Sequence, residues 1–230
     1  MKVGTDAVLL GAWAFTEGDC KRVLDIGTGS GIIALMLAQR FQWARIDAIE
    51  IDSAAGLQAK QNFIQSNWGN RLNCETIDFN AFIEDRKSNQ AANNTFGYDL
   101  IVSNPPYFNQ SLQAPDEKRN WARHGVQLTF EQLLAGTGKL LNEKGFFCVV
   151  LPISAAESFI NLALINNLFL YKKTIVYPKP NRNANRVLMA FSKQNFGGNA
   201  IQEDLQIEIE ARFDYTEGYK QLTKDFYLKF

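Results

Sequence analysis

The stretch Arg22-Val-Leu-Asp-Ile-Gly-Thr-Gly-Ser-Gly31 is the first strong structural pattern in this 230-residue chain. Its first five residues form a short, largely apolar run rich in β-branched side chains, which is typical of a buried strand. The glycines that follow predict a tight turn, because glycine adopts backbone conformations that other residues avoid. Ile32–Gln39 is then apolar at helical spacing, so the sequence predicts a helix that ends near Arg40.

The alternation of strand and helix continues along the rest of the chain. Further helices are predicted from Ser53, as the N-cap, to about Ser66, and over about 130–141 and 155–167. Further strands are predicted at about 45–50, 72–77, 98–103, 145–151, 171–177 and 186–191. This pattern predicts an α/β fold, with a doubly wound, mostly parallel, seven-stranded sheet flanked by helices.

Four segments are less regular. The polar residues 84–97 predict a surface excursion, and the last two strands are expected to form a short hairpin antiparallel to the rest of the sheet. The alternating residues that begin at Ile201 form a candidate extra strand. Near the start of the chain, Thr5 or Asp6 is expected to cap an apolar helix.

The chain shows no internal repeat and no linker, so we expect a single domain over 1–230. Within it, residues 1–20 are expected to hold the N-terminal helix, and residues 171–230 the last strands and the tail. The 24 Lys+Arg and 24 Asp+Glu give a formal net charge of zero. A nucleic acid would therefore have to be bound through a local basic patch.

The cysteines and the histidine exclude several kinds of site. Cys20, Cys74 and Cys148 are widely spaced and odd in number, and His124 is the only histidine. A disulfide framework, a Cys/His metal site and a histidine-based triad are therefore not expected, and no metal is predicted. No apolar stretch approaches the roughly 20 residues needed to span a bilayer. We expect a cytoplasmic protein without membrane contacts.

Carboxylates follow three of the predicted strands. Asp25 ends the first strand and would face a positive charge or hold the glycine turn, and Glu50 ends the second, where it could accept both hydroxyls of a ribose. Asp78 follows the third and could accept from an exocyclic amine such as N6 of adenine. The rival interpretation, a dinucleotide site, lacks the G-x-G-x-x-G spacing.

This order resembles the class I S-adenosylmethionine (SAM)-dependent methyltransferases. The resemblance implies SAM as the methyl donor and an enzyme that transfers its methyl group. The glycines let the backbone pass close under a ligand. The predicted cofactor contacts in this region are Asp25, Gly27, Gly29, Gly31, Glu50, Asp78 and Phe79.

Asn104-Pro-Pro-Tyr107, at the end of the strand 98–103, is predicted to carry the reaction. The Asn104 side chain and the Pro105 carbonyl could accept from both N–H groups of a planar amine and free its lone pair. Pro105 and Pro106 stiffen the backbone, and Tyr107 offers a face for a splayed-out base. The motif also resembles that of the glutamine-N5 methyltransferases of release factors. It therefore indicates an amine or amide nitrogen without choosing between them.

Four segments together resemble one family, the bacterial tRNA1(Val) adenine-N6-methyltransferases. These segments are Lys2–Trp13, Tyr98–Phe108, Gly145–Pro152 and Tyr215–Leu228. The resemblance implies a tRNA substrate, methylated at N6 of adenosine 37 in the anticodon loop to give N6-methyladenosine. No obligate protein partner is evident.

The family resemblance also implies roles for individual residues. Thr5 and Asp6 would lie over the methionine end of SAM, with the N-terminal helix covering the cofactor site, and Asn104–Tyr107 would hold the target adenine. Members of the family usually carry a few tens of residues before the stretch that begins at Lys2. A shortened start with weaker RNA binding is therefore expected.

Charge is unevenly distributed near the end of the chain. Residues 171–200 hold six basic side chains and no acid, whereas 201–217 hold six acids against Arg212 alone. This segregation is compatible with a basic rim for RNA phosphates or with a solvated loop. His124 is expected to be a loop or RNA-contacting residue. The candidate RNA-binding residues are Lys118, Arg119, Arg123, Lys172, Lys173, Lys179, Arg182 and Arg186.

Two alternative functions remain at this point. The first is an N5-glutamine methyltransferase that acts on a protein such as a release factor. The second is a module that binds SAM or RNA without catalysis. The presence of both Asn104–Tyr107 and the Asp25 loop disfavours the second alternative.

Overall fold

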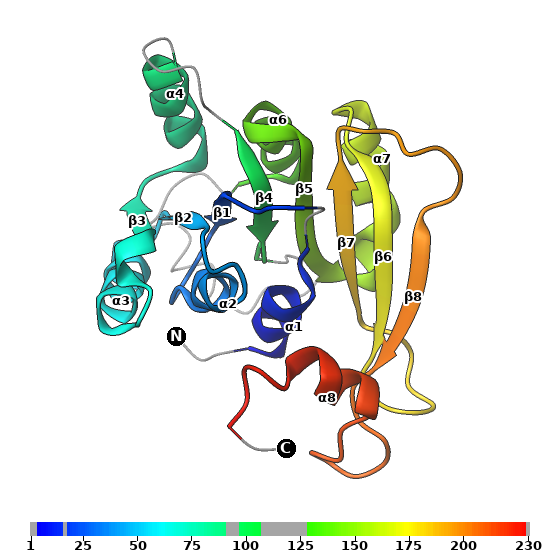
Figure 1. Ribbon diagram of the computed structural model, residues 1–230. Coiled ribbons are helices and arrows are strands. Elements are labelled where there is room, and N and C mark those ends of the chain that lie inside the picture. Colours follow the sequence, from blue (N-terminus) through cyan, green and yellow to red (C-terminus); the bar gives the residue numbers. More distant parts are fainter. Residues whose placement is uncertain (1–3, 16–17, 91–96, 107–127, 229–230) are drawn as a thin grey trace, which may run out of the picture.

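The computed structural model describes residues 4–15, 18–90, 97–106 and 128–228. Its centre is an eight-stranded sheet with the order β3-β2-β1-β4-β5-β7-β6-β8 (Figure 1). Only the pairs that β7 makes with β5 and β6 are antiparallel. The strands are β1 (Arg22–Ile26), β2 (Arg45–Glu50), β3 (Leu72–Thr76), β4 (Tyr98–Ser103), β5 (Leu141–Pro152), β6 (Phe169–Tyr177), β7 (Arg186–Ser192) and β8 (Ile201–Gln206).

Helices cover both faces of the sheet. Side chains of α1, α2 and α3 share one core cluster with the strands, and those of α4, α6 and α7 share the other (Figure 1). The helix α8 packs beside α1 through Tyr219. The helices are α1 (Thr5–Trp13), α2 (Ile32–Arg40), α3 (Ser53–Gln65), α4 (Phe79–Gln90), α6 (Phe130–Leu140), α7 (Ala156–Ile165) and α8 (Glu217–Thr223), with 3-10 turns at Gly69–Arg71 and Ile153–Ala155.

The central strands are buried on both faces, as the continuous apolar runs predict. On β4, Leu100 and Val102 join the cluster of α1 and α2, while Ile101 joins that of α4 and α6. The register brings the carboxyl ends of neighbouring strands level, since Ile26 lies opposite both Ile49 and Ser103. The carboxyl ends of the four adjacent strands β3, β2, β1 and β4 therefore lie at the same edge of the sheet.

The predicted fold class is confirmed, with two corrections to the sheet. The candidate strand that begins at Ile201 is real, so the sheet has eight strands instead of seven. Most of its side chains are exposed, and such a pattern hardly differs from that of a solvated tail. The expected final hairpin of β6 and β7 is present, but β6 does not run against the rest of the sheet, because α7 precedes it and leaves it parallel to β5. Only β7 runs the other way.

Residues 84–97 were expected to be a surface excursion, but α4 continues to Gln90. The helix buries only its beginning, through Phe79, Phe82 and Ile83, and the polar turns after them lack the apolar spacing that predicts a helix. Residues 91–96 lie outside the described part of the chain.

The caps of two helices also differ from the predictions. Asp52, and not Ser53, caps α3, because its Oδ1 accepts from the Ala55 backbone N–H at 2.7 Å. Gly4 stands at the N-cap of α1 without a side-chain cap, so neither Thr5 nor Asp6 has this role. Asp6 lies in the first turn instead, where a carboxylate interacts favourably with the helix dipole.

Candidate active site

The loop after β1 is open where a ligand would approach. Gly27 and Gly31 have φ of 72° and 83°, in the left-handed region that favours glycine. A Cβ on Gly27 would meet no atom within 4 Å, whereas one on Gly31 would meet Cε1 of Phe63 at 2.5 Å. Gly27 therefore leaves a cradle beside the backbone, and Gly31 allows α2 to pack closely on α3.

Hydrogen bonds to β2 hold this loop. The backbone N–H groups of Gly27 and Thr28 both donate to the Ile49 carbonyl at 3.0 Å. The Gly29 N–H donates to Oε2 of Glu50 at 2.8 Å, and Oε1 of the same carboxylate accepts from the Asp52 N–H at 2.9 Å. Because each carboxylate oxygen accepts more than one hydrogen bond, Glu50 can fix the loop and still accept from a ligand.

Asp25 is fully buried beneath the loop. Its Oδ2 accepts from the Thr28 hydroxyl at 2.6 Å, and Oδ1 has no hydrogen-bond partner in the described part of the chain. Burial raises the pKa of this carboxyl to about 7; the Thr28 hydrogen bond opposes the shift and the charge of Glu50 adds to it. A cation held above the loop would favour the ionised form of Asp25.

The residues after β3 divide between the site and the core. Asp78 caps α4, since its Oδ1 accepts from the backbone N–H groups of Asn80 and Ala81 at 2.9 and 3.2 Å. Phe79 is buried against α6, where a Cβ on Gly136 would lie 2.4 Å from its Cε1. The structure therefore places Phe79 in the packing of α4 on α6.

Two residues that the sequence analysis did not single out help to build the site. Ile51 directly follows Glu50 and is 47% exposed, so its apolar surface is available to a planar ring. Its signal in the sequence is an apolar residue immediately after the carboxylate that ends a strand. Ser103 is buried at the end of β4, and its hydroxyl donates to the Ile26 carbonyl at 2.9 Å. This bond ties Asn104 to the end of β1.

The proline motif leaves β4 beside the glycine loop. Asn104 is partly buried, Pro105 is buried and Pro106 is exposed. Tyr107 lies outside the described residues, as do the candidate RNA-binding residues Lys118, Arg119 and Arg123, and His124.

The order of these groups along the sheet edge fits SAM. Asp78, Glu50, the glycine loop and Asn104 follow the adjacent strands β3, β2, β1 and β4. Adjacent strands lie about 4.8 Å apart, so these strands span about 14 Å. Along this edge, Asp78 can accept from the adenine amine and Glu50 from the ribose hydroxyls. The glycine loop and the buried Asp25 come next, where the amino-acid end of SAM would lie. The residues present fit the cofactor from end to end.

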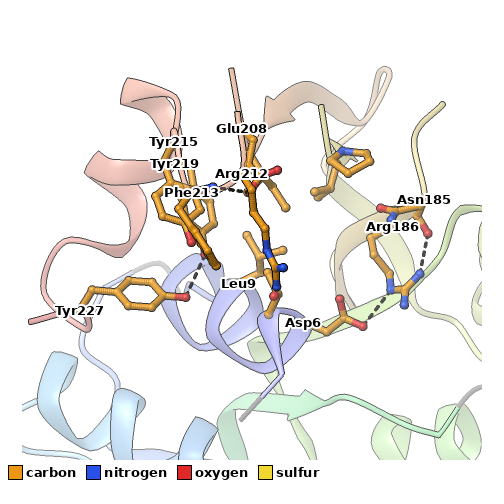
Figure 2. A pocket seen from close by; sticks show the side chains of 14 residues that line it. Asp6, Leu9, Asn185, Arg186, Glu208, Arg212, Phe213, Tyr215, Tyr219 and Tyr227 are labelled. Atoms are coloured by element: carbon orange, nitrogen blue, oxygen red, sulfur yellow. Dashed lines mark hydrogen bonds and ion pairs between the residues drawn. The ribbon is translucent and has the colours of Figure 1, made fainter. Parts of the chain in front are cut away.

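Asp6 and Arg186, predicted for cofactor and RNA respectively, pair with each other. Arg186 Nε donates to Oδ2 of Asp6 at 2.8 Å, which joins α1 to the start of β7 (Figure 2). Thr5 and Asp6 line a cavity of about 390 Å³. None of the glycine-loop residues, Glu50, Asp78 or Asn104 lines it. Thr5 and Asp6 therefore face a space beside the predicted cofactor edge.

The charge segregation near the end of the chain has a structural cause. The strand β8 pairs with β6, so the acidic segment lies alongside the basic one. Lys172 pairs with Glu203 at 2.9 Å, and Lys179 with Glu208 at 3.2 Å. Among the described residues, Lys173 and Arg182 make no such ion pair, and their RNA-binding role stays a prediction.

Comparison with known proteins agrees with this geometry. The family model described as methyltransferase small domain matches residues 4–158. A solved predicted O-methyltransferase of Agrobacterium tumefaciens, protein Atu636, covers 96% of each chain with a TM-score of 0.69 and 16% identity. A TehB-like SAM-dependent methyltransferase from Corynebacterium glutamicum has a TM-score of 0.51 at 19% identity, over 84% of this chain and 89% of that one. At these identities the likeness concerns the fold.

Fold, site and family model define a class I SAM-dependent methyltransferase. A tRNA1(Val) (adenine(37)-N6)-methyltransferase of Bacteroides fragilis is 45% identical over 100% of this chain and 92% of its own length. A protein of the same name from Pectobacterium carotovorum is 44% identical over 99% of this chain and 88% of its own. The chain belongs to the tRNA1(Val) (adenine(37)-N6)-methyltransferase family.

One finding bears on membranes. No described helix combines the length and the apolar character that crossing a bilayer requires.

Proposed function

We propose that this enzyme transfers the methyl group of SAM to N6 of adenosine 37 in tRNA1(Val). The main support for this proposal is the position of Asn104-Pro-Pro at the end of β4. The hydrogen bond between Ser103 and Ile26 ties this end of β4 to β1, the strand that leads into the glycine loop. The names of the relatives support the choice of tRNA and of adenine N6. A tRNA substrate would be met in the cytoplasm.

SAM supplies a methyl group on a sulfonium that is ready for in-line displacement. The chain's own contribution is to position the acceptor and shape its hydrogen bonding. The Asn104 side-chain oxygen and the Pro105 carbonyl accept from the two N–H groups of N6, which draws the nitrogen from planar toward tetrahedral geometry. Pro105 and Pro106 fix the direction of that carbonyl. Alignment and fixed dipoles supply the acceleration, without a covalent nucleophile.

The cofactor assignment follows the order of strand ends. Glu50 would accept from the ribose hydroxyls, Asp78 from the adenine amine, and Ile51 would cover a face of the adenine ring. The backbone at Gly27, Gly29 and Gly31 would pass under the amino-acid end of SAM, and Asp25 would balance its positive charge. Thr5 and Asp6, at the start of α1, line the neighbouring cavity instead.

The target base has to leave the stack of the anticodon loop to reach Asn104. Unstacking is cheapest in a single-stranded loop, which is where position 37 lies. Tyr107 stacks on the extruded base in this proposal. Phosphate contacts come from Lys173 and Arg182, and Lys118, Arg119 and Arg123 stay candidates from the sequence, while Lys172, Lys179 and Arg186 are engaged in ion pairs.

The proposal is tested by offering two acceptors in parallel. The enzyme is incubated with SAM and unmodified bulk tRNA in one tube, and with SAM and a glutamine-bearing release factor in another. Mass spectrometry of nucleosides and of peptides is expected to find N6-methyladenosine and an unmodified protein. Methylation of the release factor with unchanged RNA would instead establish the glutamine enzyme.

A further inference from the structure

The cavity beside α1 is not used by the proposed methyl transfer, yet it has the features of a binding site. Its volume of about 390 Å³ lies within the range of about 300–1,000 Å³ that is usual for small-molecule sites. Its walls come from α1, the ends of β6, β7 and β8, and the tail that leads into α8 (Figure 2). We propose that it holds a second nucleobase of the tRNA, a neighbour of the methylated adenosine in the anticodon loop. This inference rests on the proposed tRNA substrate.

One wall of the cavity is aromatic. Phe213, Tyr215, Tyr219 and Tyr227 gather on the side of the tail, opposite Asp6 and Arg186 (Figure 2). The rings of Tyr215 and Tyr219 lie 5.0 Å apart, and the hydroxyls of Tyr219 and Tyr227 are 3.0 Å apart. Tyr219 is buried behind this wall, so the most accessible ring is that of Phe213, and such a face can stack with any nucleobase, because each base has a π-face.

Phe213 is held in a conformation that its own packing does not explain. Its φ is 70°, a region that bulky residues rarely adopt, and its side chain is 65% exposed. Oε1 of Glu208 fixes it by accepting from the Phe213 backbone N–H at 2.9 Å. The turn around Phe213 is closed by the Ile209 N–H, which donates to the Asp214 carbonyl at 2.7 Å, and it leaves the aromatic ring in solvent at the wall of the cavity, where a ligand can reach it.

Arg212 completes the wall. Its guanidinium carbon lies 4.8 Å from the centre of the Phe213 ring, and the side chain runs into the cavity toward α1 (Figure 2). In the described part of the chain it makes no ion pair. A guanidinium plane that rests on an aromatic ring can stack on a base and donate to its edge.

The charges of the lining favour a base over a phosphate. The residues that line the cavity carry no formal net charge, because Arg186 and Arg212 are matched in number by Asp6 and Glu208; Asp6 pairs with Arg186, and Glu208 pairs with Lys179 outside the lining. A phosphate would meet two carboxylates as well as two guanidinium groups. A neutral base, in contrast, offers both donors and acceptors, which the carboxylates and guanidinium groups can satisfy.

The position of the cavity fits a nucleotide next to the target. Arg186 lies opposite Pro152 of β5, and β5 is the neighbour of β4. Two strand spacings, about 10 Å, therefore separate the line of β4, which ends at Asn104, from that of β7. A chain that presents adenosine 37 to Asn104 can place an adjacent base in the cavity.

The test uses the full chain with Arg212→Gln and Phe213→Gly. The glycine variant accepts a φ of 70° without strain, so loss of folding would not explain its phenotype. Trp43→Ala and Arg45→Gln are the matched controls, because both side chains are exposed at the start of β2, on the opposite edge of the sheet. The measurements are kcat/KM for unmodified tRNA1(Val), the SAM Kd and the melting temperature.

Stacking on an aromatic side chain contributes about 5- to 150-fold to single-strand binding. We expect kcat/KM for tRNA to fall at least 10-fold in both cavity variants, with the SAM Kd within 2-fold of the unchanged enzyme. A tRNA transcript with 2-aminopurine next to position 37 should change its fluorescence on binding, and Phe213→Gly should remove the change.

Three results would overturn the inference. The cavity variants could match the controls on tRNA, or they could lose SAM affinity instead, which would make the cavity part of the cofactor site. Equal loss for tRNA with no change in the 2-aminopurine signal of the unchanged enzyme would assign the cavity to some other part of the RNA. Failure of the proposed function can be told apart from these results, because the unchanged enzyme would then leave tRNA unmethylated.

Discussion

Asn104 is the residue on which the proposed chemistry depends most directly. Changing Asn104 to Ala removes one of two acceptors for the N6 amine and should lower kcat by about 10²–10³-fold, as loss of one positioned hydrogen-bonding group does in other enzymes. The SAM Kd should stay within about 2-fold. Initial rates at saturating tRNA and calorimetric titration with SAM check this, and an equal loss of rate and SAM affinity would remove Asn104 from its role.

Asp25 predicts a pH dependence of stability. Its folded pKa of about 7 lies above the ordinary value of 3.8, so the folded protein holds this proton more tightly than the unfolded chain. Its stabilising contribution is complete below about pH 4 and is lost as the pH rises to about 7. Without SAM, the melting temperature of the unchanged protein should therefore drop more between pH 5 and pH 8 than that of Asp25→Asn. Parallel melting curves across this range would contradict the assignment.

For single residues, the sequence predicts which chemical groups are present better than it predicts which way a side chain points. Asp25, Glu50 and Asn104 could be found because each follows an apolar strand and carries a group that the reaction needs. Phe79 also follows a strand, yet it faces the core against Gly136, because the start of α4 packs on α6. Which way a side chain points depends on contacts between distant segments.

The turn between β1 and α2 leads to a prediction about the SAM affinity of a glycine variant. Gly27 and Gly198 both have left-handed φ, 72° and 77°, and a Cβ on either would meet no atom within 4 Å. Each change to Ala should therefore cost a similar stability, about 1–2 kcal/mol. Only Gly27→Ala places its Cβ in the proposed cradle and should weaken SAM binding at least 10-fold. Thermal melting and SAM titration of both variants test this, and equal SAM affinity would exclude Gly27 from the site.

Elements with a strong hydrophobic period could be predicted, and those without one could not. The strands β1, β2 and β4 carry apolar runs that are buried on both faces, and their bounds agree with the prediction. In α4 and β8 the polar residues dominate, and their structure comes from neighbours: α6 for the helix and the edge of β6 for the strand. Such edge and surface elements are specified by the fold that they join.

Charge distribution is a property of the whole molecule. The acidic segment after Ile201 lies against β6, so two of the charges on each side that are segregated along the chain pair in space, Lys172 with Glu203 and Lys179 with Glu208. The sequence shows the segregation without the pairing, because the partner of an edge strand cannot be read from its own residues. Lys173 and Arg182 are therefore better candidates for RNA contact than Lys172 and Lys179.

This distribution predicts a modest salt dependence of tRNA binding. Changing Lys173 and Arg182 together to Gln should weaken binding and lower the slope of log Kd against log salt by about 1.4, at about 0.7 for each contact to single-stranded RNA. The control is Arg45→Gln with Lys144→Gln, two exposed cations at the opposite edge of the sheet. Binding titrations between 50 and 300 mM salt measure the slope. An equal slope in both double variants would remove Lys173 and Arg182 from the interface.

In the proposed reaction, Asn104, beside the SAM edge of the sheet, positions N6 of adenosine 37 for methylation. The most direct test of this role is mass spectrometry of nucleosides from two tRNA1(Val) transcripts, one with adenosine and one with guanosine at position 37, after single-turnover reaction with SAM. We expect N6-methyladenosine in the first transcript only, and none in either with Asn104→Ala. N6-methyladenosine in the guanosine transcript, or undiminished product with Asn104→Ala, would contradict it.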